Sequence, residues 1–204
     1  EAADGQLEAL MVQVGSGDPA VAGRTFDEVH DAVGLPILVQ DYPMVSGVTI
    51  SPDALGRLVA DRPYVVGLKC EAPPTAAAIA VLRGLVGVPC FGGLGGVGLV
   101  DELAAGSAGA MTGFSCPEGL LAAVRAFAEG GFPAARDAFS PWLPLANFEG
   151  QPGIGLAIRK EILRRRNVIA DSSVRPPAPG IPPSLLPRLA EHLATLPAPL
   201  TPIC

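Results

Sequence analysis

The amino-acid sequence predicts an α/β protein: a (β/α)8 TIM barrel that here lacks its first strands and ends in a helical extension. Three observations predict this fold. Short apolar runs alternate with helical stretches of about a dozen residues, as in successive βα units around a parallel sheet. The apolar runs recur about every 20–28 residues, a spacing that fits such a barrel. Beyond residue 131 the helical pattern continues without further strands.

Apolar runs and helical periodicity give the individual elements. The predicted strands are residues 9–14, 37–40, 65–69, 89–92 and 109–113. The predicted helices between and after them are residues 25–33, 51–60, 75–85, 97–105 and 118–129. The helix at 51–60 has a good start signal, because Ser51 suits the N-cap and Pro52 the first helical position.

Five strands cannot close a barrel of eight, so preceding units on the order of 80–100 residues are expected. The first residue is glutamate rather than methionine, which agrees with that expectation. We therefore expect residues 1–131 to hold strands 4–8 of the barrel and residues 132–204 to form the helical extension. The predicted helices of the extension are residues 132–148, 153–166 and 184–196, the last two separated by a proline-rich linker at 175–179.

Composition limits the classes of partner. Apolar residues make up 49% of the chain and the net charge is −6, which argues against a nucleic-acid or anionic-membrane surface. No apolar run reaches the ~20 residues of a membrane span, and no signal peptide is visible. The four cysteines show neither zinc nor disulfide spacing. We expect a cytoplasmic protein that binds a small molecule and uses no cofactor or metal.

Lys69 is the most informative residue, because it ends the apolar run 65–69 and is the only lysine among the first 150 residues. The carboxyl end of a buried parallel strand is where α/β folds place their chemistry. Burial there favours the uncharged amine, which can attack a carbonyl and form a Schiff base. The alternative is a strand-end lysine that pairs with nearby Glu71.

Four segments occur in a distinctive order. Residues 35–43 read LPILVQDYP, residues 51–55 read SPDAL, residues 65–69 read VVGLK, and residues 106–113 read GSAGAMTG. They resemble the fifth strand, the helix start after it, the lysine strand and the eighth strand of the dihydrodipicolinate synthase and N-acetylneuraminate lyase family. Members of that family are Schiff-base aldolases and lyases built on a (β/α)8 barrel with a helical C-terminal extension.

The resemblance implies roles for individual residues. Lys69 would form an imine with a 2-oxo acid such as pyruvate, and the protonated imine would stabilise a carbanion at the neighbouring carbon. Gly92 and Met111 align with positions that line the substrate pocket of the family. The family commonly assembles as dimers or tetramers, so a homo-oligomer is expected.

The end of the predicted strand 37–40 departs from the family pattern. Gln40 stands where the family has a proton-donating tyrosine, and an amide cannot carry a proton at neutral pH. The side chain of Tyr42 leaves the chain on the same side as that of Gln40, about 6–7 Å further along the strand direction. Tyr42 therefore either replaces the family's tyrosine or packs in the loop. Asp41 is a candidate substrate-binding residue beside Gln40, the alternative being a hydrogen bond to loop backbone. Residues 15–19 also lack the tyrosine of the family's proton relay.

Three functions remain open from the sequence. The first is a lyase or aldolase that acts on a 2-oxo acid through Lys69, by carbon–carbon cleavage, condensation or dehydration. The second is a barrel that binds a small carbonyl or carboxylate ligand without turnover, because the tyrosine relay is lost. The third is a structural partner of an active relative.

Three other signals have simpler explanations. Residues 93–98 fit the dinucleotide pattern GxGxxG, but the acidic residue expected about 20 residues later is missing, which favours a glycine-rich loop at the barrel mouth. The basic run between Arg159 and Arg166 is interrupted by Glu161 and indicates a solvated face or subunit contact. Asp101 and Glu102 begin a predicted helix, whose dipole accounts for acidic residues there.

Overall fold

The computed structural model describes residues 7–197, which divide into two units. The first unit comprises residues 7–93 and 101–111, and the second comprises residues 94–100 and 112–197. The strands are β1 (Leu10–Gln13), β2 (Ile37–Asp41), β3 (Val65–Cys70), β4 (Cys90–Gly92) and β5 (Gly109–Ala110). The helices among and just after them are α1 (Pro19–Val33), α2 (Pro43–Ser46), α3 (Pro52–Ala60), α4 (Thr75–Arg83) and α5 (Leu99–Ala104).

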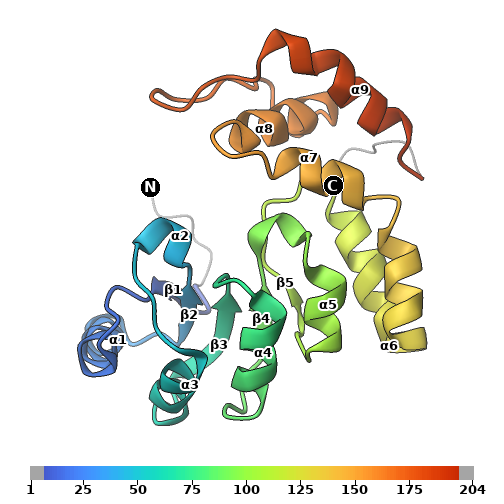
Figure 1. Ribbon diagram of the computed structural model, residues 1–204. Helices are drawn as coiled ribbons and strands as arrows, with labels where there is room; N and C mark the ends of the chain where they lie inside the picture. The colour runs from blue at the N-terminus through green and yellow to red at the C-terminus, as the bar shows by residue number, and fades with distance from the viewer. Residues whose placement is uncertain (1–6, 198–204) are drawn as a thin grey trace. The chain divides into compact units, whose positions relative to one another are not determined.

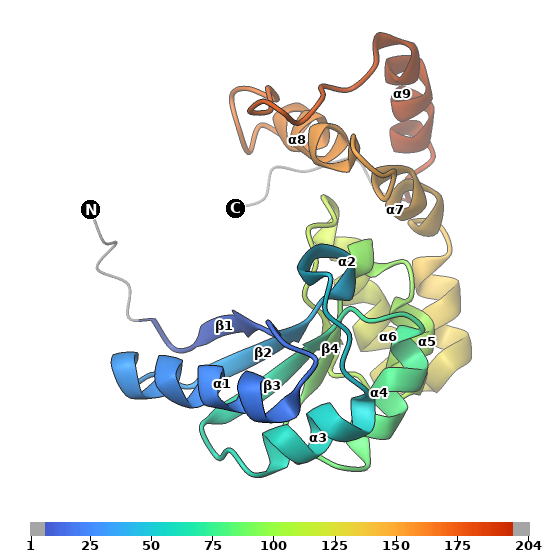
Figure 2. The same ribbon diagram turned by 60° about the vertical axis from the view of Figure 1, so that its left-hand side comes forward.

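The first unit is built on one parallel sheet with strand order β1-β2-β3-β4-β5. Each strand pairs with the next strand along the chain, and α1, α3 and α4 lie on one face of the sheet (Figures 1 and 2). Sequential parallel pairing through helical connections is the repeating unit of a (β/α)8 barrel. The predicted α/β fold class is therefore confirmed.

The core of the first unit lies between the sheet and these helices. Ile37 and Val39 of β2 are fully buried there, together with Phe26 of α1, Leu55 of α3 and Ile79 of α4. The residues of β2 alternate between buried and half-buried along the strand. Since successive strand side chains point to opposite faces, Ile37 and Val39 face the helices, while Leu38 and Gln40 lie on the opposite face of the sheet.

A bulge in β3 decides which face carries Lys69. Ile37 of β2 pairs with Val65, but the next residue of β2, Leu38, pairs with Gly67, so Val66 is an extra residue. Val66 is 42% exposed, whereas the prediction had this run buried throughout. Because one inserted residue reverses the alternation that follows it, Lys69 lies on the sheet face opposite the helices.

The starts of two helices test the capping signals of the sequence. The prediction for α3 is confirmed, since the Ser51 hydroxyl accepts a hydrogen bond from the amide of Ala54 at 3.2 Å. The predicted start of the first helix at residue 25 is wrong, because α1 begins at Pro19. Asp18 caps α1, because its side chain accepts a hydrogen bond from the Ala20 amide at 2.8 Å. This start signal, an aspartate followed by proline, is visible in the sequence.

The second unit consists of helices and turns. They are η1 (Leu94–Gly96), α6 (Pro117–Phe139), α7 (Leu143–Glu149), α8 (Gly155–Arg165), η2 (Pro183–Leu185) and α9 (Leu186–Ala194). The predicted helix over residues 132–148 is wrong as one segment, because α6 continues to Phe139 and α7 begins after Pro141. Gly131, with φ 66°, kinks α6 at the predicted boundary between barrel and extension. Pro133 follows inside the helix and removes one backbone hydrogen-bond donor there.

Candidate active site

Lys69 and Glu71 form an ion pair at the carboxyl end of β3. The Lys69 Nζ lies 3.1 Å from the Glu71 Oε2, and their side chains are 15% and 6% exposed. The two residues are two positions apart, so their side chains leave the strand on the same face. The alternative that the sequence left open, a pairing of Lys69 with Glu71, is therefore present in the structure.

Gln40 joins this pair from the neighbouring strand. It stands directly opposite Lys69 in the register of β2 and β3. Its Nε2 donates a hydrogen bond of 2.6 Å to the Glu71 Oε2, the same oxygen that faces the amine. Gln40 holds a carboxylate beside the amine, and we call Lys69, Gln40 and Glu71 the lysine cluster.

The backbone around Glu71 fixes its carboxylate. Its own amide donates to the Asp41 carbonyl at 2.8 Å, which extends the pairing of β2 and β3 by one bond. A Cβ on Gly93 would lie 2.2 Å from the Glu71 Oε1, so only glycine leaves space for this side chain. The first glycine of the GxGxxG pattern thus makes room for a buried carboxylate.

The remaining predicted site residues fall into two groups. Tyr42 follows β2 as the N-cap residue of α2, and its carbonyl accepts a hydrogen bond from the Gln13 Nε2 at 3.3 Å. Gly92 and Met111 lie together, since the Met111 amide donates to the Gly92 carbonyl at 2.9 Å. The structure thus brings Lys69 to Gln40 and Gly92 to Met111. Roles for these residues in catalysis or binding remain predictions.

Asp41 occupies the face of β2 opposite Gln40. It pairs in register with Cys70 and is 5% exposed, on the side where Ile37 and Val39 contact the helices. Burial raises the pKa of its carboxyl from 3.8 to about 6. A substrate-binding role for Asp41 remains a prediction, but its side chain does not share the face of Lys69.

The pKa of Asp41 makes stability depend on pH. The folded chain retains a proton that the unfolded chain has already released between about pH 4 and 6, so stability decreases as pH rises through this window. We expect Asp41→Asn to remove this contribution and to raise the free energy of unfolding at pH 7 by about 1–3 kcal/mol. Urea unfolding at pH 4.5 and 7 tests this, and an equal pH slope in both proteins would contradict it.

Glu102 is a buried carboxylate whose importance the sequence did not reveal. It is 1% exposed, and its Oε1 accepts a 2.6 Å hydrogen bond from the Thr75 hydroxyl at the start of α4. Burial raises its pKa, against the lowering effect of Thr75. Its Oε2 is buried and has no hydrogen-bond partner among residues 7–197. Glu102 lies in the first turn of α5, as predicted, but no short sequence pattern reports that its side chain is buried.

Gly92 makes room for Glu102, which gives a stability prediction. A Cβ at residue 92 would lie 1.7 Å from the Glu102 Oε2 and 2.4 Å from its Cδ. We expect Gly92→Ala to reduce the free energy of unfolding by about 1–3 kcal/mol, because the buried Glu102 side chain must move and give up its hydrogen bond from Thr75. Gly87→Ala is the control, since nothing lies within 4 Å of the added atom. Similar denaturation midpoints of the two variants would contradict this packing.

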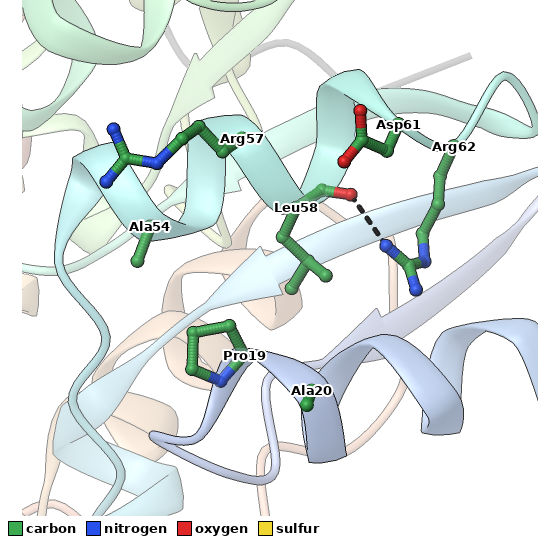
Figure 3. Close-up of a pocket in the computed structure, with 7 residues that line it drawn as sticks. All are labelled: Pro19, Ala20, Ala54, Arg57, Leu58, Asp61 and Arg62. Atoms are coloured by element: carbon green, nitrogen blue, oxygen red, sulfur yellow. Dashed lines mark hydrogen bonds between the residues drawn. The ribbon is translucent and has the colours of Figure 1, made fainter.

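A separate pocket lies on the helix side of the first unit. It has a volume of about 420 Å³ and is lined by residues from the start of α1 and from α3, including Pro19, Leu58 and Arg57 (Figure 3). Arg62 at its edge donates to the Leu58 carbonyl at 2.9 Å and pairs with Asp27. Since α1 and α3 cover the face of the sheet opposite Lys69, this pocket is distinct from the lysine cluster.

Residues 7–197 contain no group of three or more histidine, cysteine, aspartate or glutamate side chains placed to hold a metal ion. Within the same residues, no helix has both the length and the apolar character needed to cross a membrane. Cys70, Cys90 and Cys116 are free and buried, while Cys204 lies outside the described residues.

Fold and site together define a protein of the (β/α)8 barrel class with a polar cluster at the carboxyl ends of its strands. No family model matches the chain. It is 34% identical over 192 residues to L-2-keto-3-deoxyarabonate dehydratase of Azospirillum brasilense, covering 87% of this chain and 60% of that relative. It is 33% identical over 155 residues to 4-hydroxy-tetrahydrodipicolinate synthase of Corynebacterium aurimucosum, covering 74% and 50%.

Among solved structures, dihydrodipicolinate synthase from Rhodopseudomonas palustris matches with a TM-score of 0.83 and 27% identity, covering 92% of this chain and 65% of that one. The chain belongs to the dihydrodipicolinate synthase and N-acetylneuraminate lyase family. It spans 60% and 50% of the lengths of the two curated relatives. The predicted family and barrel class are confirmed.

Proposed function

We propose that this chain carries the Schiff-base site of a lyase that acts on a 2-oxo acid, with Lys69 as the amine nucleophile. One observation supports this most strongly. The Lys69 Nζ lies 3.1 Å from a buried carboxylate oxygen, on the sheet face opposite the helices and at the carboxyl end of a parallel strand. A carboxylate at this distance can take the proton of the ammonium when a carbonyl arrives, which leaves the amine free to attack.

We further propose that Glu71 moves the proton that the family moves with tyrosine. Its Oε2 contacts both Lys69 and Gln40. After imine formation, the carbon next to the imine becomes acidic, because the protonated imine accepts the electron pair of the C–H bond. In this proposal Glu71 removes that proton. The Gln40 amide fixes the carboxylate oxygen by donating to it, a role that needs no proton transfer from the amide.

Dehydration of a 3-deoxy-2-oxo acid fits this arrangement, and the relative named L-2-keto-3-deoxyarabonate dehydratase supports the choice. Lys69 adds to C2 and water leaves as the imine forms. Glu71 takes a proton from C3, the enamine expels the C4 hydroxyl, and the glutamic acid returns its proton so that the hydroxyl leaves as water. Hydrolysis of the remaining imine releases the 2-oxo product and restores the amine. No oxidant, reductant or metal takes part in these steps.

Borohydride trapping tests the imine. The protein is incubated with pyruvate, reduced, digested and mapped by mass spectrometry. The chain has two lysines, Lys69 and Lys160, so an adduct is readily located. We expect the mass increase on the peptide that contains Lys69. An adduct confined to Lys160, or no adduct with pyruvate or longer 2-oxo acids, would overturn the proposal.

A second candidate is a carbonyl-binding barrel without turnover. The observation that favours it is the same ion pair, because a carboxylate at 3.1 Å also stabilises the charged, unreactive form of Lys69. Deuterium exchange into the pyruvate methyl group separates the two. Exchange requires both imine formation and removal of a C3 proton, so its presence supports the lyase. Trapping without exchange supports the binding protein. Assembly into dimers or tetramers remains a prediction.

A further inference from the structure

A second polar centre lies in the helical unit, where Arg159 of α8 faces a buried carboxylate. The Arg159 Nε is 3.5 Å from the Glu149 Oε2, and Glu149 at the end of α7 is 1% exposed. Glu149 also accepts hydrogen bonds from the amide of Ser115, at 3.2 Å, and from its hydroxyl. Glu149 is therefore held by Ser115, and its carboxylate faces the Arg159 guanidinium as an ion-pair partner.

Arg159 has a buried donor, its Nε, without a hydrogen-bond partner among residues 7–197. Its contact with Glu149 is a 3.5 Å ion pair. The other well-buried arginines differ. Arg166, 2% exposed, donates to the Ser115 carbonyl at 2.6 Å, and Arg62, 17% exposed, donates to Asp27 and Leu58. Since buried donors are normally paired, the buried Nε of Arg159 indicates a guanidinium less fully satisfied than those of Arg166 and Arg62.

Glycines flank the guanidinium where side chains would cover it. A Cβ on Gly113 would lie 3.1 Å from the Arg159 Nη1, and one on Gly95 would lie 3.8 Å from the Nη2. Both terminal nitrogens therefore border backbone that carries no side chain. The Arg159 side chain is 30% exposed, so solutes reach it. A partly exposed guanidinium whose terminal nitrogens border glycines matches the planar, two-oxygen geometry of carboxylate and phosphate groups.

We propose that Arg159 forms an oxyanion-binding site in the helical unit, taking the carboxylate of an organic acid or an inorganic phosphate on its terminal nitrogens. Glu149 positions the guanidinium from behind, and Gly95 and Gly113 leave the approach open. Burial raises the pKa of Glu149 to about 7, against the lowering effects of Ser115 and Arg159. The positive charge of Arg159 is then only partly compensated near neutral pH. In this proposal Arg159, the first residue of the basic run that ends at Arg166, binds a ligand.

Nuclear magnetic resonance of the arginine side chains tests this site directly. The protein, labelled with ¹⁵N, is titrated in parallel with malonate and with inorganic phosphate, using sodium chloride at equal ionic strength as the blank. We expect a saturable shift of the Arg159 Nε–H signal, and the anion that saturates at lower concentration identifies the source of the oxyanion. A shift no larger than that of Arg165, which pairs with Glu161 at 2.9 Å, would overturn the proposal.

Variants separate a ligand site from a structural ion pair. Arg159→Lys keeps the charge but loses the planar pair of donors, so we expect binding to weaken about tenfold. Arg159→Gln with Glu149→Gln removes both charges together, which avoids leaving Glu149 unpaired, and should abolish saturation. Arg165→Lys is the matched control on the same helix. Binding that survives the double change would contradict the assignment. Borohydride trapping at Lys69 is independent of these results, so the two proposals fail separately.

Discussion

Lys69→Arg is expected to abolish borohydride trapping with pyruvate and to lower turnover by a factor of at least about 10⁴, the scale of losing a covalent nucleophile. A guanidinium stays protonated and cannot form the imine. It can still pair with Glu71, whose carboxylate lies 3.1 Å from the present amine. The fold should therefore survive, and the loss should concern chemistry alone. Trapping, turnover and thermal unfolding of the variant are measured together.

Lys160→Arg is the matched control for this experiment. Lys160 is the other lysine of the chain and lies on α8, where its Nζ donates to the Ser173 carbonyl. We expect trapping and turnover in this variant to equal those of the parent protein. If Lys69→Arg traps as well as the parent, the imine forms elsewhere. If Lys69→Arg is also unfolded, Lys69→Met with unchanged helical signal provides the same test.

The strand that carries Lys69 shows what the sequence can predict. Five apolar residues bounded by turn signals identify the strand at residues 65–69, and the observed β3 extends it only to Cys70. The location of the lysine at the carboxyl end follows from the direction of a parallel sheet. The face that it occupies does not follow, because the bulge at Val66 reverses the alternation and depends on pairing with Leu38.

Contacts of the candidate site between residues that are close in sequence could be predicted from the sequence. Glu71 is two residues from Lys69, and their pairing was already an alternative from the sequence. The link from Gln40 to the same oxygen spans 31 residues and depends on the register of β2 and β3, which no local pattern encodes. Asp41 was grouped with Gln40 because they are adjacent, although adjacent strand residues point to opposite faces.

Glu71→Gln is expected to separate imine formation from proton transfer. Glutamine is close in size and can keep the contact with Gln40, but its amide cannot accept a proton from carbon. We therefore expect trapping on Lys69 to persist while deuterium exchange into the pyruvate methyl group falls by a factor on the order of 10²–10⁴. Glu71→Asp shortens the side chain but keeps the carboxylate, so partial recovery of exchange is expected. Exchange is followed by proton magnetic resonance.

Tyr42→Phe is the decisive comparison, because Tyr42 is the other candidate for the proton carrier. It follows β2 at the start of α2, and its backbone carbonyl holds the Gln13 side chain at 3.3 Å, a contact that phenylalanine preserves. If Glu71 moves the proton, Tyr42→Phe retains exchange close to the parent rate. The opposite result, with exchange lost in Tyr42→Phe and kept in Glu71→Gln, would assign the relay to the tyrosine. Glu71 would then serve only as the counter-ion of Lys69, which its 3.1 Å separation also permits.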